Sequence, residues 1–221
     1  MLENILPYEE YLLYLINHTH IYFLDCFMWL VSKTQVWIPL FILLLFLLIY
    51  KKSYKDWLPI LIVIALVFLF CDQFSSGICK PYFSRLRPTH HPDFMNEVRV
   101  LHGYRGGKHG FISGHAANAF GFATITALLF RNKMYAFAIY GFAFMIAYSR
   151  VYLGVHFISD ILAGSISGII IGVIMYLIYR LYTKNRISVV LSTYRTKSLS
   201  ISMIIYIFIL LLYSALRLII V

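Results

Sequence analysis

The chain has 221 residues and a formal net charge of +10, with 61% hydrophobic residues, 13% charged residues and a mean hydropathy of +0.80. These values exclude an ordinary soluble protein, in which about 25% of the residues are charged. A nucleic-acid partner is not expected either, because the cations are not interleaved with aromatic side chains as such a surface requires. The composition predicts an all-α protein, a polytopic helical bundle in the membrane bilayer.

The N-terminal segment, residues 1–33, is mixed in character. Between residues 5 and 30, tyrosine and leucine are interspersed with charged side chains and histidines. We expect an interfacial helix along the membrane surface here rather than a further span. A charged leader region and a small-residue cleavage site are both missing, so we expect no removable signal peptide.

Six later stretches are apolar and long enough to cross a bilayer, which takes about 17–20 residues. They are residues 34–50, 57–79, 114–130, 134–151, 157–179 and 200–221. The sequence therefore predicts six transmembrane helices in one domain, residues 1–221. Within it we expect a catalytic core at 34–180, a basic cytoplasmic loop at 181–199 and an extra C-terminal transmembrane helix at 200–221.

Lysine and arginine favour one orientation of these spans, because short cytoplasmic loops carry the excess of cations. The cations gather after the first, third and fifth spans: Lys51, Lys52, Lys55, Arg131, Lys133, Arg180, Lys184, Arg186, Arg195 and Lys197. If the spans alternate in direction, these three connections lie in the cytoplasm. The connections 80–111 and 150–156 then face each other on the outer side.

The segment from Lys80 to Pro88 ends the second span with three cations. One interpretation is that these side chains snorkel toward lipid phosphates. The alternative is a phosphate clamp, in which Arg87 offers a planar fork and Lys80 a point charge. Pro88 would stop the helix and fix the direction of the chain after the clamp.

Ser113, Gly114 and His115 precede a run of small residues that opens the third span. Helix N-termini present unpaired N–H groups and a partial positive charge, so this is a candidate anion site. We expect Ser113 to be the N-cap and Gly114 to let a ligand approach the backbone closely. A capped membrane helix without any ligand would have the same tripeptide.

His156 and Asp160 are four residues apart, next to Arg150 at the end of the fourth span. If both lie at the start of the fifth helix, they stack on one face. Asp160 then accepts a hydrogen bond from one imidazole nitrogen and leaves the other for a substrate, which turns a histidine into a nucleophile or base. A satisfied polar pair is the alternative, but ionisable groups at membrane depth are costly and are usually functional.

In this order, Lys-x6-Arg-Pro, Ser-Gly-His and Ser-Arg-x5-His-x3-Asp resemble the signature motifs of the type 2 phosphatidic acid phosphatase family. The resemblance covers about residues 36–180 and implies that His156 attacks phosphorus, Asp160 orients it and His115 protonates the leaving oxygen. It also implies which residues hold the phosphoryl oxygens: Lys80, Arg87, Ser113, Gly114 and Arg150. The family usually has proline before Ser-Gly-His, where this chain has Ile112; we expect this change to affect loop geometry without removing activity.

No metal or other cofactor is expected, because three cations and a helix N-terminus suffice to stabilise charge on a transferred phosphoryl group. The competing hypothesis is a zinc site, since several histidines are predicted on the same side: His90, His91, His102, His109, His115 and His156. We favour the metal-free site, because cations crowd it and Asp160 is the one clear carboxylate ligand.

Residues outside the three clusters are given mainly structural roles. Three cysteines match neither a zinc site nor a disulfide framework and are expected to pack as small apolar side chains: Cys26, Cys71 and Cys79. A glycine ridge in the fifth span indicates close helix packing within the bundle or a dimer seam: Gly164, Gly168 and Gly172. We expect residues 89–110 to be a lid or head-group reader, or a solvated loop, and Asp72 to support Lys80 or Arg87.

Three functions compete. The leading hypothesis is a lipid phosphatase in a bacterial inner membrane, with its site facing the periplasm and lipid A phosphate or undecaprenyl diphosphate as the favoured substrate. Phosphatidylglycerophosphate and phosphatidic acid share the same phosphate chemistry. The alternatives are a non-catalytic lipid-binding or lipid-moving protein on the same scaffold, and a transporter. The expected partners are the substrate lipid and the bilayer, and the oligomeric state is not predicted.

Overall fold

The computed structural model describes residues 6–93, 95–183 and 193–220, and within them the chain is helical with no strand. The helices and short helical turns follow in this order: α1 (Leu6–Asn17), α2 (Tyr22–Ser32), a 3-10 turn (Thr34–Trp37), α3 (Ile38–Ile49), α4 (Tyr54–Asp72), a π-helical segment (Gln73–Cys79), α5 (Lys80–Phe83), two 3-10 turns (Pro88–His90 and Leu101–Gly103), α6 (Gly114–Phe130), α7 (Lys133–Tyr152), α8 (Ile158–Tyr182) and α9 (Thr193–Ile220). The all-α prediction is confirmed for this part of the chain.

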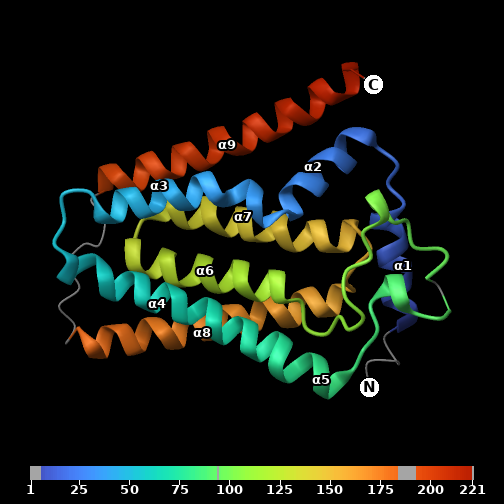
Figure 1. Ribbon diagram of the computed structural model, residues 1–221, viewed down its shortest axis with the longest axis horizontal. Helices are drawn as coiled ribbons and strands as arrows, with labels where there is room; N and C mark the ends of the chain where they lie inside the picture. Colours follow the sequence, from blue (N-terminus) through green and yellow to red (C-terminus); the bar gives the residue numbers. More distant parts are fainter. Residues whose placement is uncertain (1–5, 94, 184–192, 221) are drawn as a thin grey trace.

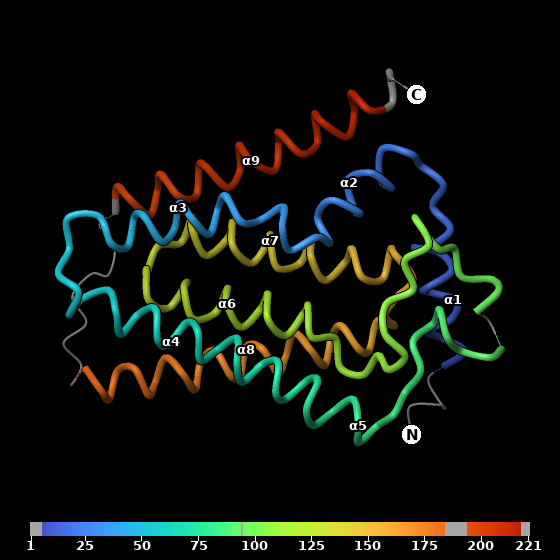
Figure 2. Tube along the Cα trace, viewed as in Figure 1, coloured from blue at the N-terminus to red at the C-terminus, as the bar shows by residue number. Residues whose placement is uncertain are grey.

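Helix α6 lies at the centre of the bundle, packed against α4, α7 and α8, while α9 covers α2, α3 and α7 (Figures 1 and 2). The long helices run roughly side by side, so their connections gather at two ends. One end holds the connections after α3 and α6 with the end of α8 and the start of α9, and the other holds α1, the loop between α5 and α6 and the turn between α7 and α8 (Figure 1). The predicted grouping is therefore confirmed for the described part of the chain.

The glycine ridge of α8 lets its backbone approach α6 closely. A Cβ atom at Gly168 would lie 2.2 Å from the Ala117 carbonyl oxygen, and one at Gly164 would lie 2.5 Å from the Ser113 carbonyl oxygen. Neither distance is compatible with a side chain larger than hydrogen. The ridge serves close packing within the bundle, as predicted, and it holds the N-terminal turns of α6 and α8 together.

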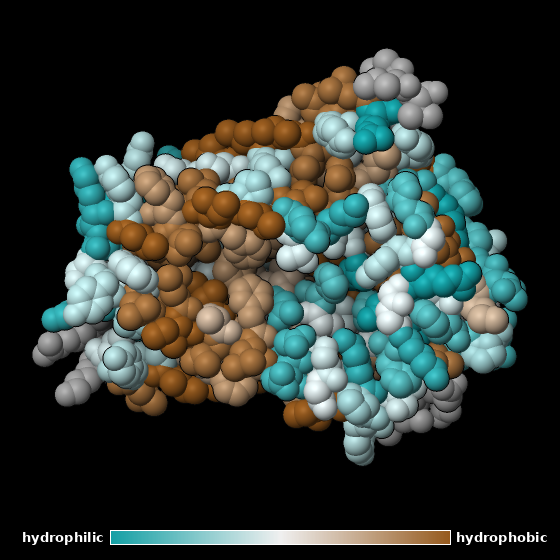
Figure 3. Space-filling model, in the orientation of Figure 1, coloured by the Kyte–Doolittle hydropathy of each residue, from teal (hydrophilic) through white to brown (hydrophobic). Residues whose placement is uncertain are grey.

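Among the residues that the structure describes, four helices are long and apolar enough to cross a membrane: Tyr54–Phe83, Lys133–Tyr152, Ile158–Tyr182 and Tyr194–Arg217. The pair Tyr22–Ser32 and Thr34–Ile49 passes the same test together but is bent by 75°, and α6 is a shorter apolar helix. The chain is thus a multi-pass membrane protein with four or five candidate spans, while six spans remain a prediction. Figure 3 shows an apolar belt between two more polar ends on one face.

Two predicted boundaries were wrong. The N-terminal segment forms two helices, broken at residues 18–21, instead of one helix over 5–30. Helix α9 begins at Thr193, so residues 193–199 are helical rather than part of the basic loop. The guanidinium of Arg195 donates to the carbonyl oxygens of Leu47 and Tyr50, at 3.1 and 3.0 Å, and so satisfies carbonyls at the end of α3. The rest of the predicted loop, residues 184–192, lies outside the described residues.

Candidate active site

The three motif-bearing segments meet at the end of the bundle that also holds α1. The loop between α5 and α6 folds back on itself, because Arg87 N donates to Lys108 O at 3.0 Å and Gly110 N donates to Arg85 O at 2.9 Å. Ser113 N then donates to the carbonyl oxygen of Asp160, at 3.0 Å, and joins the start of α6 to the first turn of α8. The predicted site residues therefore share one region.

His156 and Asp160 form the buried centre of this region. Their side chains are 1% and 0% exposed, and His156 Nδ1 lies 3.2 Å from Asp160 Oδ2. The condition for stacking on one helix face is not met, because α8 begins at Ile158 and His156 precedes it. Asp160 reaches back from the first turn instead, and its Oδ2 also accepts from Phe157 N at 3.1 Å. An aspartate in a helix's first turn is a favourable partner for these free N–H groups.

The turn before His156 depends on Gly154. This residue has a φ of +68°, and a Cβ atom there would lie 2.4 Å from Val98 Cγ1. Val155 N donates to Arg150 O at 3.1 Å, which closes the turn at the end of α7. Because glycine alone enters this conformation without strain, the turn brings Arg150 and His156 to the same side.

Burial lowers the pKa of the His156 imidazole well below its ordinary value. Three nearby cations lower it further: Arg87, Arg150 and Lys80. The ring is therefore neutral near pH 7. Since Nδ1 faces the carboxylate of Asp160, the tautomer with a proton on Nδ1 is the one that Asp160 stabilises, and it leaves a lone pair on Nε2.

The cations come from three different elements. Arg87 donates from Nε to His109 O at 3.1 Å and from Nη1 to Val155 O at 3.3 Å, next to the catalytic candidate His156. The amine of Lys80 donates to Ser76 Oγ at 2.9 Å. It also lies 3.9 Å from where a Cβ atom at Gly114 would stand, which places Lys80 beside the N-terminus of α6.

Arg150 is 1% exposed, and it is held from two sides. Its guanidinium donates to Ser32 Oγ on α2, and through Nη2 to Tyr104 Oη at 2.8 Å. Its buried Nε has no hydrogen-bond partner among the described residues. A buried arginine with an unpaired N–H at the edge of a cationic site is poised for a further anionic partner.

The Ser-Gly-His segment lies at the start of α6, where Ser113 was predicted to be the N-cap. Ser113 is the N-cap, and its Oγ accepts from Ala116 N at 3.4 Å. Ile112, where the family usually has proline, is 2% exposed and packed inside the protein. His115 lies in the first turn of α6, near His156 and the three cations.

Arg85 and Glu9 are the residues that the sequence analysis missed. Arg85 Nη1 donates to Asp160 Oδ1 at 3.0 Å and to Ser159 Oγ at 2.6 Å, and Nη2 pairs with Glu9. The other oxygen of Glu9 accepts from Ser159 N at 2.8 Å, at the N-terminus of α8. Arg85 was counted among the three cations of its segment, but no sequence signal linked it to a glutamate so far away in the chain.

The loop 89–110 is docked on the N-terminal helices. The Asn17 side chain accepts from Arg99 N at 2.7 Å and donates to Arg99 O at 3.0 Å, and Arg99 also forms an ion pair with Asp25. This docking places Tyr104 against Arg150. Asp72, expected to support a cation directly, acts through Ser76, whose hydroxyl donates to Asp72 Oδ1 at 3.4 Å.

The alternative of a zinc site finds no ligand set in the described part of the chain, where no three His, Cys, Asp or Glu side chains are grouped to hold a metal ion. All three cysteines are free; Cys71 and Cys79 are buried as predicted, and Cys26 is half-buried.

Comparison with known proteins connects this geometry to a family. Residues 57–184 match the PAP2 superfamily. The chain is 44% identical to a lipid A 4'-phosphatase of Porphyromonas gingivalis, over 84% of this chain and 78% of that protein, and 35% identical to a lipid A 4'-phosphatase of Bacteroides thetaiotaomicron, over 80% of each. Among solved structures, Aquifex aeolicus LpxE superposes with a TM-score of 0.54 at 30% identity, covering 74% of this chain and 92% of that one. A PAP2 type phosphatidylglycerolphosphate phosphatase from Bacillus subtilis has the same fold, with a TM-score of 0.63 at 21% identity, covering 83% of this chain and 88% of that one.

Proposed function

Because the chain belongs to the PAP2 superfamily, we propose that it is a membrane lipid phosphatase. It hydrolyses a phosphate monoester of lipid A through a phosphohistidine intermediate on His156. The observation that carries this proposal is the neutral, buried His156, held by Asp160 at 3.2 Å and surrounded by three cations. The two relatives named lipid A 4'-phosphatase favour lipid A over undecaprenyl diphosphate.

In the proposed reaction, the lone pair on His156 Nε2 attacks phosphorus while the bond to the sugar oxygen breaks. His115 donates a proton to that leaving oxygen, and Asp160 stabilises the charge that develops on the attacking ring. Water then attacks the phosphohistidine, His115 takes the proton of the water, and the phosphorus–nitrogen bond breaks to release phosphate and neutral His156. Each group returns to its starting state.

Charge stabilisation falls to the residues that hold the phosphoryl oxygens. Phosphoryl transfer depends mainly on positioning and on neutralising the charge of the equatorial oxygens. The unpaired Nε of Arg150, the guanidinium of Arg87 and the amine of Lys80 supply this positive charge, and Ser113 and Gly114 add the N-terminal N–H groups of α6. On this mechanism the reaction proceeds without a metal ion.

We place the protein in a bacterial inner membrane with the site facing the periplasm. The end of the bundle opposite the site carries lysine and arginine at the connections after α3 and α6, at the end of α8 and at the start of α9, which is the pattern of cytoplasmic loops. A lipid head group at the outer surface would then meet the site directly.

The decisive experiment measures phosphate release by purified protein in detergent, with EDTA present, from lipid A, undecaprenyl diphosphate and phosphatidylglycerophosphate. His156→Ala is the matched inactive control. We expect release from lipid A to survive EDTA and to vanish in the variant. Protein quenched in base should carry phosphate on a histidine, and acid treatment should remove it, since phosphohistidine is preserved in base and lost in acid. If folded wild-type protein releases phosphate from none of these lipids, the phosphatase proposal fails and lipid binding or transport takes its place.

A further inference from the structure

A cavity of about 260 Å³ extends from the candidate site into the apolar interior of the bundle. It lies between α2, α3, α4, α6 and α7, and His115 lines it at the site end. Ser32, the hydroxyl partner of Arg150, lines it too. The cavity therefore begins where the proposed reaction takes place.

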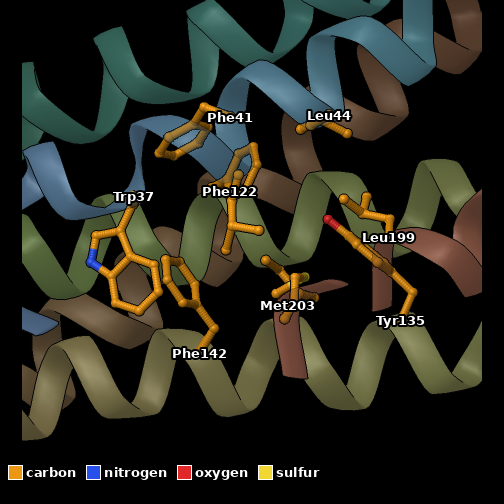
Figure 4. A pocket seen from close by; sticks show the side chains of 10 residues that line it. Trp37, Phe41, Leu44, Phe122, Tyr135, Phe142, Leu199 and Met203 are labelled. Carbon is orange, nitrogen blue, oxygen red and sulfur yellow. The ribbon is translucent and has the colours of Figure 1, made fainter. Parts of the chain in front are cut away.

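Deeper in the bundle the walls are aromatic. Trp37 and Phe142 form an edge-to-face pair with ring centroids 4.4 Å apart, and the ring centroids of Phe41 and Phe122 are 5.3 Å apart. These four rings also line a smaller cavity of about 30 Å³ that continues toward Met203 on α9 (Figure 4). The two cavities thus share these four rings as walls, and the side chains between His115 and Met203 are largely apolar.

One polar atom in the larger cavity has no partner. Asn118 lies one turn after His115 on α6, and its buried Oδ1 has no hydrogen bond to any residue that the structure describes. Buried carbonyl oxygens are almost always paired, and one without a partner calls for an explanation. Its position in the cavity wall, close to the site, indicates a hydrogen-bond donor on the ligand.

We propose that this cavity binds a fatty acyl chain of the lipid substrate and that Asn118 accepts a hydrogen bond from an amide N–H or hydroxyl group near the start of that chain. The proposal rests on the proposed function and narrows its substrate class to lipids with acyl chains on a phosphorylated amino sugar. A polyprenyl diphosphate has no donor beyond its phosphates, so it leaves Asn118 unpaired. The aromatic walls of the cavity can pack against the apolar part of either lipid, an acyl chain or a polyprenyl chain.

The first test replaces Asn118 with leucine, which keeps the size of the side chain and removes the acceptor. We expect KM for lipid A to rise about 5- to 10-fold, the worth of one neutral hydrogen bond, while the same substitution changes KM for undecaprenyl diphosphate less than twofold. The matched control is Thr126→Val, a buried polar residue of the same helix away from the cavity, which should leave the preference between the two lipids unchanged. An equal rise in KM for both lipids would overturn the role of Asn118.

The second test reports binding without turnover. The protein carries His156→Ala, with Trp29→Phe and Trp57→Phe, so that fluorescence comes from Trp37 in the cavity wall. The probe is an N-acyl glucosamine phosphate with two bromine atoms on its acyl chain.

We expect saturable quenching of Trp37, and its loss when Ala119→Phe fills the cavity. No quenching in folded protein would refute an acyl chain in this cavity. If the probe quenches Trp37 but the protein with His156 intact hydrolyses no lipid, the acyl-chain site stands and the phosphatase proposal fails.

Discussion

The buried ion cluster of Arg85, Glu9 and Asp160, which lies behind His156, predicts that substitutions there change stability and kcat independently. Arg85 pairs with both Glu9 and Asp160, and the exposed fractions of the three side chains are 5%, 7% and 0%. Replacing Arg85 with methionine keeps most of the side chain's volume and removes its charge. Both carboxylates are then buried without their cation.

The cost can be estimated from this geometry. Removing one partner of a buried ion pair destabilises a protein by about 3–5 kcal/mol, because the other charge stays buried without compensation. We expect Arg85→Met to lower the free energy of unfolding by that amount. Asp160 also loses a hydrogen bond that fixes its orientation, and a displacement of about 1 Å at such a group costs about 100-fold in kcat.

A second substitution distinguishes the two effects. In the Arg85→Met protein, Glu9→Leu removes one of the two uncompensated carboxylates, so about 1–3 kcal/mol of the lost stability should return. Asp160 still lacks its arginine, and kcat should stay low. Unfolding is followed by SDS titration in mixed micelles, and kcat by phosphate release from lipid A.

The matched control is Arg99→Met, which breaks the ion pair with Asp25 at the same end of the bundle. It should cost less stability, because this pair is more exposed, and leave kcat within about threefold. Two results would contradict the reasoning: a kcat in Arg85→Met within twofold of wild type, or a recovery of kcat together with stability in the double variant.

Three further predictions concern the site and the bundle. Arg87→Gln removes a cation that destabilises the charged ring of His156, so the pKa of His156 should rise. The acid limb of the pH profile of kcat/KM then moves to higher pH. Measuring this profile for both proteins with the same lipid checks the prediction, and an acid limb that stays in place or moves to lower pH would contradict it. Asp160→Asn should lower kcat about 10²- to 10⁴-fold with little change in KM, and a KM effect without loss of kcat would show that Asp160 serves binding. Gly168→Ala should destabilise the bundle by about 1–3 kcal/mol, since its Cβ would lie 2.2 Å from a backbone oxygen of α6. Gly141→Ala is the control and should be neutral or stabilising, because a Cβ atom there meets no described atom within 4 Å. Equal melting temperatures of the two variants would refute the packing argument.

Local sequence signals predicted the parts of the site that depend on nearby residues. Ser113 was correctly predicted to be the N-cap of α6, and the apolar run 114–130 correctly predicted both ends of this helix. Capping and hydropathy both act within a few residues, so the local sequence contains them. The four-residue spacing of His156 and Asp160 predicted their contact, although the aspartate reaches back from the first turn of α8 rather than standing above the histidine on a helix face.

Long-range contacts could not be predicted in the same way. Glu9 and Arg85 are 76 positions apart, and neither the spacing nor the composition of their segments selects this pair from many other charged residues. The same limit applies within the Lys80–Pro88 segment. Three cations were evident there, but which of them pairs with a carboxylate depends on how the loop folds back toward residues 108–110.

This division of the cations bears on how the site works. Behind His156, Arg85 offsets one of the two carboxylates, Glu9 and Asp160, and one negative charge is left over. In the proposed attack, the ring of His156 becomes positive as it bonds to phosphorus, and that charge develops beside this remaining negative charge.

On the other side, the proposal has the charge of the phosphoryl oxygens meet Lys80, Arg87 and Arg150, and the Nε of Arg150 has no partner in the described part of the protein. Both changes in charge are thus favoured by groups that are already in place before the substrate binds, so little reorganisation is needed during the reaction. A site with Arg85 on the phosphate side would have four cations around the substrate and two uncompensated carboxylates against His156. Those carboxylates would favour the protonated ring and remove the lone pair that the attack requires.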